Sequence, residues 1–549
     1  DGLLYPFGIG RVGATIAENK PPYLSESIAT FGKIFWLFLV GMIMLFWDSL
    51  ENLEKRKRIL FTAAFVILIL GLTFTRISTS GLLNGENFIS RFLYLGSIGL
   101  FILVFIYSLI KAKLDGDEKI MEAFRKIDVG LVLILAFSFF ALISMRGAIR
   151  LFFIVSLAVV IVSSFVPIRI KKSLSNKNNG EVTKLFLFIL LLISIFAIIL
   201  TGISYFNQTN FQAKATAPSI YEQQWQGAML WVRENTPEGA IFTHWWDYGY
   251  WVQTLGERPT VSDGGHFIGY WDHLVGRYLL TTEKPETALS FMKAHNVSYL
   301  LIDSTDLGKY SAYSSIGSNS GGEDRLSQIP VMVSDPSQTI ESADKETRIY
   351  VGGTPVDEDI IYSQEGQEIF LPANRAFFAA TVLEVSKKNS QISFNKPYGI
   401  FVYNNQQIRI PLRYIYFKGE LIDFKDGLNA TVRILPLISL SGQGVEIDNM
   451  GATIYLSPKV SGSLFAQLYL MDDVFNNYPT LKISHSEPDP FIGSLNQQGA
   501  NVQDFVYYQG FRGPIKIWKV DYPSNIIGRE EFLKTDGDYA EFDNLTFTR

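Results

Sequence analysis

The chain of 549 residues contains no cysteine and only five histidines. Without cysteine it cannot form disulfide bonds, present a thiolate nucleophile or bind zinc through sulfur. The histidines do not form HExxH or another spacing typical of zinc sites. The formal net charge of −5 gives no reason to expect a nucleic-acid partner. These absences exclude the common cysteine-based and zinc-based chemistries.

Hydrophobic residues are abundant, at 48% of the chain, and they are concentrated before about residue 206. Six apolar stretches are each near the length that a helix needs to cross about 30 Å of hydrocarbon. These stretches cover residues 31–47, 59–75, 92–110, 129–144, 151–168 and 185–206. We therefore predict six transmembrane helices within residues 31–206.

Basic residues predict the orientation of these spans. They cluster in the loops after the first, third and fifth stretches, beginning with Lys55, Arg56, Lys57 and Arg58. Loops rich in Lys and Arg stay in the cytoplasm. The loop of residues 1–30 and all of the chain after residue 206 would then lie outside the cell. We expect a multi-pass protein of the cell membrane with a large extracellular C-terminal part.

Two patterns follow the last span. Residues 207–335 alternate between helical and strand-like segments, which is typical of a mixed α/β domain. The predicted strands are 240–243, 259–262 and 297–303, and the predicted helices are 221–234, 266–280 and 284–295. Residues 336–549 contain short β-branched and aromatic runs between turns, which favours a β-rich domain of sandwich or barrel type. That domain carries no recognisable chemistry, so scaffolding or partner binding is its expected role.

The pentad 245–249 (WWDYG) follows the predicted strand 240–243, where open α/β sheets bind ligands. On an extended backbone Trp245 and Trp246 point to opposite faces, and each carries one N–H donor. Asp247 adds an acceptor, and Gly249 permits a tight turn. Together these groups could hold a small hydroxyl group. The alternative is a buried aromatic corner capped by an aspartate, with His244 as a structural neighbour.

The pentad matches the WWDYG signature of oligosaccharyltransferase catalytic subunits, and two further segments resemble motifs of that family. Residues 15–18 (TIAE), which contain Thr15 and Glu18, resemble the TIxE motif of an external loop. Residues 306–309 (DLGK) resemble the DxxK motif, although Tyr313 stands where the family has Met or Ile. That difference puts in doubt the usual apolar contact with an acceptor Thr. The alternative for this segment is a Ser/Gly-rich loop that contains an Asp and a Lys by chance.

The resemblance is to the archaeal-type, single-subunit enzyme, and the implied fold is GT-C-like. That fold is a multi-span α-helical membrane domain with an exterior α/β domain and a β-rich domain. The implied reaction is glycan transfer from a lipid-(pyro)phosphate carrier of the dolichol type to the Asn of N-x-S/T acceptor proteins. The chain begins with Asp1 and shows no signal peptide. Because the family's acidic DxD-type motifs are missing, we expect an N-terminally truncated, inactive fragment.

The resemblance also implies roles for individual residues. The two Trp residues, the Asp of the pentad and the Lys of the DxxK-like segment would recognise the Ser or Thr of the sequon. The remaining motif residues would support them. The recognition residues are Trp245, Trp246, Asp247 and Lys309, and the supporting residues are Thr15, Tyr248, Gly249 and Asp306.

Glu18 would be the catalytic carboxylate, which accepts hydrogen bonds from the N–H groups of the acceptor amide. Glu18 is also a possible ligand of Mg²⁺ or Mn²⁺, whose main ligands would belong to the missing N-terminal part. Arg146 and Arg150 lie in a short predicted exterior turn. Either they extend their charged ends to the membrane interface, or a guanidinium binds a lipid phosphate in bidentate fashion. Arg150 resembles the family's phosphate-contacting arginine more closely than Arg146 does.

Two other functions stay open. The chain could belong to a different polytopic glycosyltransferase that uses a lipid-phosphate sugar and a hydroxyl acceptor. It could also be a non-catalytic, membrane-anchored surface protein whose β-rich region binds partners.

Overall fold

The computed structural model describes residues 13, 15–115, 118–216, 223–342, 344–364, 366–388, 391–441 and 444–537. The chain separates into two compact units, Asp1–Pro218 and Ser219–Arg549. Each unit is described by itself.

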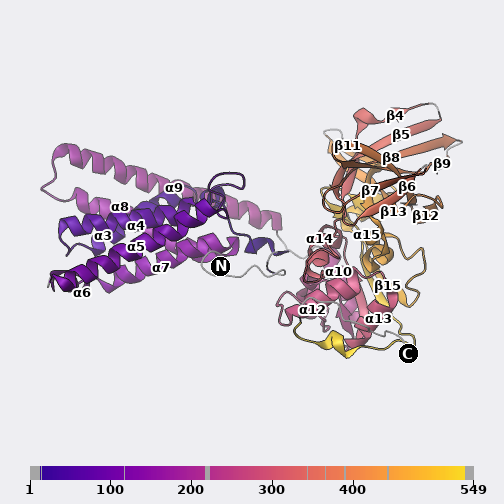
Figure 1. Ribbon diagram of the computed structural model, residues 1–549, viewed down its shortest axis with the longest axis horizontal. Coiled ribbons are helices and arrows are strands. Elements are labelled where there is room, and N and C mark those ends of the chain that lie inside the picture. Colours follow the sequence, from indigo (N-terminus) through magenta and orange to yellow (C-terminus); the bar gives the residue numbers. More distant parts are fainter. Residues whose placement is uncertain are drawn as a thin grey trace. The chain divides into compact units, whose positions relative to one another are not determined.

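The first unit is helical, and its helices lie alongside one another (Figure 1). They are α2 (Leu24–Phe31), α3 (Ile34–Ser49), α4 (Lys55–Phe74), α5 (Phe88–Leu114), α6 (Glu118–Arg125), α7 (Val129–Gly147), α8 (Phe152–Leu174) and α9 (Glu181–Thr216), with short 3-10 turns η1 (Ala17–Asn19) and η2 (Ile149–Leu151). In the described part of the chain, five helices are long and apolar enough to cross a membrane. A sixth span is present only if α2 and α3, bent by 99°, count as one. The first predicted span is therefore not a straight helix, because Gly32 ends α2 with a φ of 59°.

Helices α3 and α8 pack closely in the core of this bundle. A Cβ atom added at Gly41 would lie 2.6 Å from the carbonyl oxygen of Val162, so only glycine permits this approach. Beside it, the Ser163 hydroxyl donates to the carbonyl of Ile34 at 3.0 Å. Helices α5 and α9 instead leave most of their apolar side chains exposed, as helices facing lipid do.

Polar contacts mark the two ends of the bundle. At one end Arg169, near the end of α8, donates to Asp48, near the end of α3, at 3.0 Å. At the other end Arg146, near the end of α7, donates to Thr75, which follows α4, at 2.7 Å. The chain before α2 lies at this second end, because the N–H of Ile149 donates to the carbonyl of Lys20 at 3.1 Å. Glu18 therefore lies at the end opposite the first predicted cytoplasmic loop.

The second unit contains a four-stranded sheet in the order β1-β2-β18-β15. Its strands are β1 (Ile241–Thr243), β2 (Val297–Ile302), β15 (Leu481–Glu487) and β18 (Ile515–Val520). Strands β1 and β2 are parallel, as the α/β prediction requires. Because β15 and β18 come from the predicted β-rich region, the expected boundary at residue 335 does not separate the two sheets.

Helices accompany this sheet. They are α10 (Gln223–Asn235), α11 (Gly249–Thr254), α12 (Gly269–Leu274), the π-helix η4 (Val275–Leu280), α13 (Pro285–Ala294) and α14 (Asp306–Ile316). The predicted strand 259–262 is absent as a strand, and only Thr260 forms an isolated bridge with Phe242. Pro259 lacks the N–H group that a regular ladder would need at this point. Residues 306–316 form a helix, so the alternative of a loop at the DxxK-like segment is wrong.

A twelve-stranded sheet forms the rest of this unit, as predicted. Its strands are β3 (Val331–Ser334), β4 (Ile340–Glu341), β5 (Lys345–Pro355), β8 (Phe377–Lys388), β9 (Gln391–Phe394), β10 (Tyr398–Tyr403), β11 (Gln406–Phe417), β12 (Glu420–Asp423), β13 (Leu428–Ser441), β14 (Gly444–Leu456), β16 (Val506–Tyr507) and β17 (Phe511–Arg512). Strand β11 pairs with β10 and also with β13, which closes these strands into a barrel. Stacked rings of Phe378 and Tyr455, 3.7 Å apart, lie in its core.

Short elements complete the unit. The hairpin β6 (Ile360–Gln364) and β7 (Gln367–Leu371) stands apart from the large sheet. The remaining helical segments are the 3-10 turns η3 (Trp246–Tyr248), η5 (Pro336–Gln338) and η7 (Glu530–Leu533), the helices α15 (Pro458–Gly462) and α16 (Pro490–Gln497), and the π-helix η6 (Ala466–Leu470). Figure 1 shows α10, α12, α13 and α14 gathered at one end of this unit and the large sheet at the other.

Candidate functional site

The WWDYG pentad lies directly beyond strand β1. The chain leaves the strand at Thr243, makes the turn η3 and then begins α11 at Gly249. Because β1 and β2 are parallel neighbours, their carboxyl ends meet at one edge of the sheet. Helix α14, which follows β2, therefore brings the DxxK-like segment beside the pentad.

Gly249 is fixed by close packing. A Cβ atom at this position would lie 2.4 Å from the Cβ of Asp263 and 2.7 Å from the carbonyl oxygen of Ser262. The backbone φ of Gly249 is −54°, so its role is close approach and not a left-handed turn. The glycine allows the start of α11 to pack against residues 262–263, which holds the pentad in place.

Tyr248 joins the two motifs. Its hydroxyl donates to Asp306 Oδ1 at 2.8 Å and accepts from Lys309 Nζ at 3.0 Å. The Thr305 hydroxyl lies 2.8 Å from the same oxygen. Tyr248 and Asp306 are both buried, and burial raises the pKa of the Asp306 carboxyl to about 7. Burial likewise raises the pKa of Tyr248, so its hydroxyl stays a donor at neutral pH.

Asp247 and Lys309 form the exposed side of this cluster. Lys309 Nζ lies 2.9 Å from Asp247 Oδ2, and the side chains are 31% and 27% exposed. The ammonium group also lies over the Tyr248 ring, 4.4 Å from its centroid. Lys309 thus places the Asp247 carboxylate at the surface of an otherwise buried hydrogen-bond network.

The two indoles occupy different environments. Trp245 is 2% exposed, and its ring packs against Tyr313 with centroids 5.4 Å apart. Trp246 is partly exposed, and its ring lies edge-on to His266 at 4.5 Å. Its Nε1 is buried and, among the described residues, has no hydrogen-bond partner. Trp246 therefore keeps an unused donor beside Asp247, whereas Trp245 is largely a packing residue in this structure.

His244 has an unpartnered nitrogen as well. Its Nδ1 lies 2.7 Å from the carbonyl oxygen of Trp245, so this nitrogen carries the proton and donates. Burial lowers the pKa of His244 to about 4, which keeps the ring neutral. Within the described residues the buried Nε2 lacks a partner. These contacts agree with the structural role predicted for His244.

A cavity of about 390 Å³ lies next to Tyr248 and Lys309. One side of it is formed by Trp225, whose ring stacks on Tyr248 with centroids 5.0 Å apart. The other side comes from Asp489 and residues 508–512. The cavity is large enough for an extended peptide segment or another small ligand.

The first unit brings together the other predicted residues. The turn η1, which contains Glu18, packs against the turn η2, which contains Arg150. Both side chains are exposed. The Glu18 carboxylate and the Arg150 guanidinium thus lie at the same end of the helical bundle.

Arg146 has a different environment from Arg150. It is buried, and it donates to Thr75 Oγ1 at 2.7 Å and to the carbonyl of Gly85 at 3.2 Å. Its guanidinium also lies 4.3 Å from the Tyr94 ring centroid. Arg146 therefore ties α7 to the loop between α4 and α5, which is neither of the two roles considered from the sequence.

Residues 239–329, which include the pentad and the DxxK-like segment, match the family model described as the STT3/PglB/AglB core domain. This segment is similar to that core domain. The match confirms the resemblance to oligosaccharyltransferase catalytic subunits over the core domain.

Curated relatives match this chain over a short length. The dolichyl-phosphooligosaccharide-protein glycotransferase 1 of Pyrococcus furiosus is 37% identical over 95 residues, which is 17% of this chain and 10% of that protein. The glycosyltransferase subunit STT3B of Oryza sativa subsp. japonica is 33% identical over 75 residues, or 14% of this chain and 10% of that protein. The matched segment thus spans a tenth of each relative.

Among solved structures, the Archaeoglobus fulgidus oligosaccharyltransferase tethered to an acceptor peptide with the NVT sequon is 12% identical. That likeness has a TM-score of 0.35 and covers 84% of this chain and 56% of that chain. The complex of the same organism's AglB with an inhibitory peptide and a dolichol-phosphate has a TM-score of 0.35 at 13% identity, covering 88% of this chain and 64% of that chain.

The core domain supplies no metal site of its own. Nowhere in the described residues do three or more His, Asp or Glu side chains form a group that could hold a metal ion. Glu18 is an exposed carboxylate in a different unit. The described residues therefore do not form a site that fits the Mg²⁺ or Mn²⁺ that the resemblance implies.

Several residues around the cavity and Trp246 were not predicted as part of the site. Asp489 and residues 508–512 line the cavity, yet they lie far beyond the matched segment, which ends at residue 329, and carry no motif. His266 contacts Trp246 and lies 2.7 Å from Asp272, which raises the pKa of His266. In the sequence these residues resemble ordinary surface or core positions, so no local signal identified them.

Proposed function

We propose that this chain is part of an enzyme that transfers an oligosaccharide from a lipid-(pyro)phosphate carrier to the Asn of an N-x-S/T sequon. The observation that carries the proposal is the ion pair between Asp247 and Lys309. It joins the WWDYG and DxxK-like segments inside the stretch that matches the family model, and Lys309 also lines the cavity beside Tyr248. The matching relatives are named as glycotransferases of dolichyl-phosphooligosaccharides.

The cluster around Asp247 suits recognition of the sequon hydroxyl. The buried Trp246 Nε1 can donate to that hydroxyl, and the Asp247 carboxylate can accept its proton. Such a site rejects a ligand that lacks the hydroxyl, because the Trp246 donor, which has no partner among the described residues, would stay unsatisfied. Trp245, Tyr248, Gly249 and Asp306 hold these two groups in position.

Glu18 and Arg150 are assigned to the other half of the reaction. The lone pair of a carboxamide nitrogen is delocalised, so the nitrogen is a poor nucleophile. A carboxylate such as Glu18, by accepting an amide N–H, orients the nitrogen toward the anomeric carbon. The new C–N bond forms as the bond between the anomeric carbon and the carrier phosphate oxygen breaks; the nitrogen passes one proton to the Glu18 carboxylate, and the carrier leaves as its phosphate. Arg150 would bind the departing phosphate in bidentate fashion.

The location follows from the same proposal. The first unit would span the cell membrane, and the second unit would lie on the extracellular side, where acceptor proteins emerge. The basic loops that predict this orientation begin with Lys55–Arg58. The proposed metal, Mg²⁺ or Mn²⁺, would need ligands beyond the described residues.

A peptide-binding experiment tests the recognition step with the chain as it stands. We would titrate the detergent-solubilised protein with peptides that differ only in the third sequon position, N-x-T against N-x-V. Valine matches threonine in shape and lacks its hydroxyl. We expect N-x-T to bind at least about tenfold more tightly, because the loss of a hydrogen bond to a charged group costs roughly 1.5–3 kcal/mol.

Equal affinity for the two peptides would contradict the recognition role. The transfer reaction is tested separately with the complete enzyme, a lipid-linked glycan and three peptides: N-x-T, Q-x-T and a Ser-rich sequence. Transfer to N-x-T alone supports the proposal. Transfer to the Ser-rich peptide would indicate the hydroxyl-accepting class of glycosyltransferase.

A further inference from the structure

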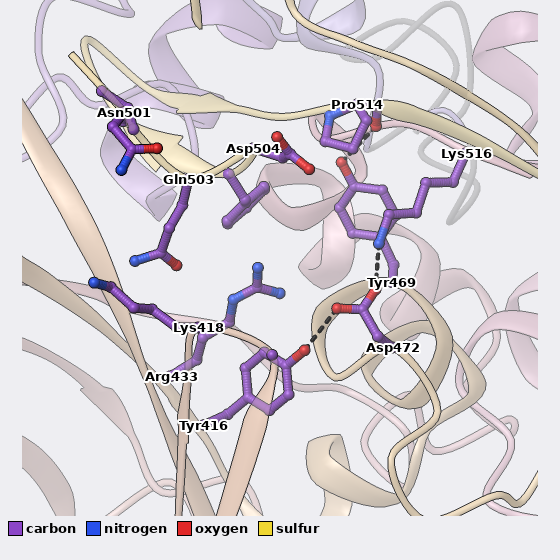
Figure 2. Close-up of a pocket in the computed structure, with 13 residues that line it drawn as sticks. Tyr416, Lys418, Arg433, Tyr469, Asp472, Asn501, Gln503, Asp504, Pro514 and Lys516 are labelled. Carbon is purple, nitrogen blue, oxygen red and sulfur yellow. Dashed lines mark hydrogen bonds and ion pairs between the residues drawn. The ribbon is translucent and has the colours of Figure 1, made fainter. Parts of the chain in front are cut away.

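A second cavity lies between the barrel and the C-terminal segment, and it shares no lining residue with the cavity at Tyr248. Its volume is about 490 Å³ (Figure 2). It is lined by barrel residues, by the segment after η6 and by residues 501–505 and 514–516. None of its lining residues lies in the segment that matches the family model.

Arg433 is the central charged group of this cavity. Its side chain, from strand β13, is 8% exposed, and Figure 2 shows its guanidinium directed into the cavity. One nitrogen donates to the carbonyl of Leu470. The guanidinium also lies 4.6 Å from the Phe505 ring centroid and 5.2 Å from that of Tyr416. These partners are neutral, so they hold the guanidinium in place without cancelling its charge.

The nearest carboxylate is already paired. Asp472 forms an ion pair with Lys516 and accepts a hydrogen bond from the Tyr416 hydroxyl at 2.6 Å. Asp504 lines the same cavity with an exposed side chain, and so does Lys418. Three cations therefore face two carboxylates across the cavity, and the buried cation forms no ion pair with a described residue. A buried cation in this situation favours an anionic ligand.

Uncharged hydrogen-bond donors line the same cavity. The Nε2 atom of Gln503 is buried and has no hydrogen-bond partner among the residues that the structure describes. In Figure 2 Gln503 lies between Asn501 and Lys418, at the edge of the cavity. An unsatisfied buried amide costs free energy unless a ligand or water pairs with it. A side-chain amide beside a guanidinium suits a ligand that carries a hydroxyl group next to a negatively charged group.

We infer that this cavity binds a saccharide-sized organic anion, with its carboxylate or phosphate on Arg433 and Lys418 and a hydroxyl group on Gln503. The planar guanidinium offers the paired donors that both kinds of anion accept. A cavity of this volume holds a small organic ligand, whereas a bare ion would leave most of it to water. The inference does not depend on the proposed glycan transfer.

The experiment uses four probes on the whole chain in detergent: glucuronate, glucose 6-phosphate, glucose and inorganic phosphate. Isothermal titration calorimetry gives each affinity. We expect glucuronate or glucose 6-phosphate to bind at least about tenfold more tightly than glucose, as expected for a charge-assisted hydrogen bond. The better of the two anions tells whether a carboxylate or a phosphate is preferred.

Variants of the lining residues test whether the ligand binds in this cavity. Gln503→Met, which keeps the shape of the side chain, should weaken binding about tenfold. Lys418→Gln should weaken it about twofold to fivefold, because this lysine is exposed. The matched control is Lys425→Gln, an exposed lysine of the same barrel that does not line the cavity. It should bind like the unchanged protein.

Three results would overturn the inference. Glucose binding as tightly as both glucuronate and glucose 6-phosphate would show that the charge is irrelevant. Inorganic phosphate binding as tightly as glucose 6-phosphate would show that the hydroxylated body contributes nothing. Unchanged affinity in Gln503→Met would place any bound ligand elsewhere. Both cavity variants alter half-buried or exposed side chains, so their folding can be checked by thermal unfolding.

Discussion

The ammonium group of Lys309 lies 2.9 Å from the carboxylate of Asp247, although the two residues come from different motifs. The same ammonium contacts the Tyr248 hydroxyl, which in turn donates to the buried Asp306. The acidic and basic residues of the two motifs thus form one continuous network. Its exposed end, Asp247, is the group available to a ligand.

Removal of Asp247 should weaken acceptor binding. Asp247→Ala leaves Lys309 without its partner and removes the proposed acceptor for the sequon hydroxyl. We expect at least about a tenfold loss of N-x-T affinity and little change for N-x-V. Calorimetry with the two peptides measures both values. Unchanged N-x-T binding would exclude the proposed recognition role.

Trp246→Phe tests the unused indole donor. The substitution keeps a six-membered aromatic ring near His266 and removes the Nε1 donor, which has no partner among the described residues, together with part of the indole ring. Stability should fall slightly, because the smaller ring packs less well against Trp245. The preference for N-x-T over N-x-V should fall about tenfold or more. If the variant keeps the full preference, the indole donor has no part in recognition.

Gly249→Ala should destabilise the second unit. The new Cβ would meet Asp263 at 2.4 Å, so the start of α11 must move. We expect a loss of about 1–3 kcal/mol, the usual cost of overpacking, measured as a lower unfolding temperature. Gly308→Ala, with no atom within 4 Å of the added Cβ, is the matched control. It should be neutral or stabilising by up to about 1 kcal/mol, because alanine favours the helix.

The Asp306 carboxyl should make stability depend on pH. Burial raises its pKa from 3.8 to about 7, so between these values the folded chain binds more protons than the unfolded chain. Stability from this group is therefore greatest in acid and falls as pH rises from about 4 to about 7. The unfolding temperature of the native chain relative to Asp306→Asn should fall by several degrees over that range. A flat difference between the two proteins would mean that the carboxyl titrates normally.

The two arginines of the α7–α8 connection should behave differently. Arg146→Gln breaks buried hydrogen bonds to Thr75 and Gly85, so it should lower the unfolding temperature strongly. Arg150→Gln alters an exposed side chain, so its effect on unfolding should be much smaller. We expect Arg150→Gln instead to weaken binding of a short-chain polyprenyl phosphate in detergent. Equal effects of both variants on unfolding, with no change in phosphate binding, would remove the donor role of Arg150.

Local sequence determined a large part of this protein. The apolar stretches predicted the helices of the first unit, because the length and hydrophobicity of a span are properties of consecutive residues. Strands β1 and β2 and the pentad between strand and helix were likewise predicted from neighbouring residues. The motif residues therefore identified the core domain before any contact was known.

Only the tertiary structure decided how these pieces meet. From the sequence we expected Trp245 and Trp246 to act as equal donors. Tyr313 packs against the Trp245 indole, whereas the Trp246 Nε1 has no hydrogen-bond partner in the part of the chain that the structure describes. Arg146 became a buried structural group, and β15 and β18, which start at Leu481 and Ile515, joined a sheet whose first strand starts at Ile241. Such contacts join residues far apart in the chain, and packing, not local pattern, selects which of them form.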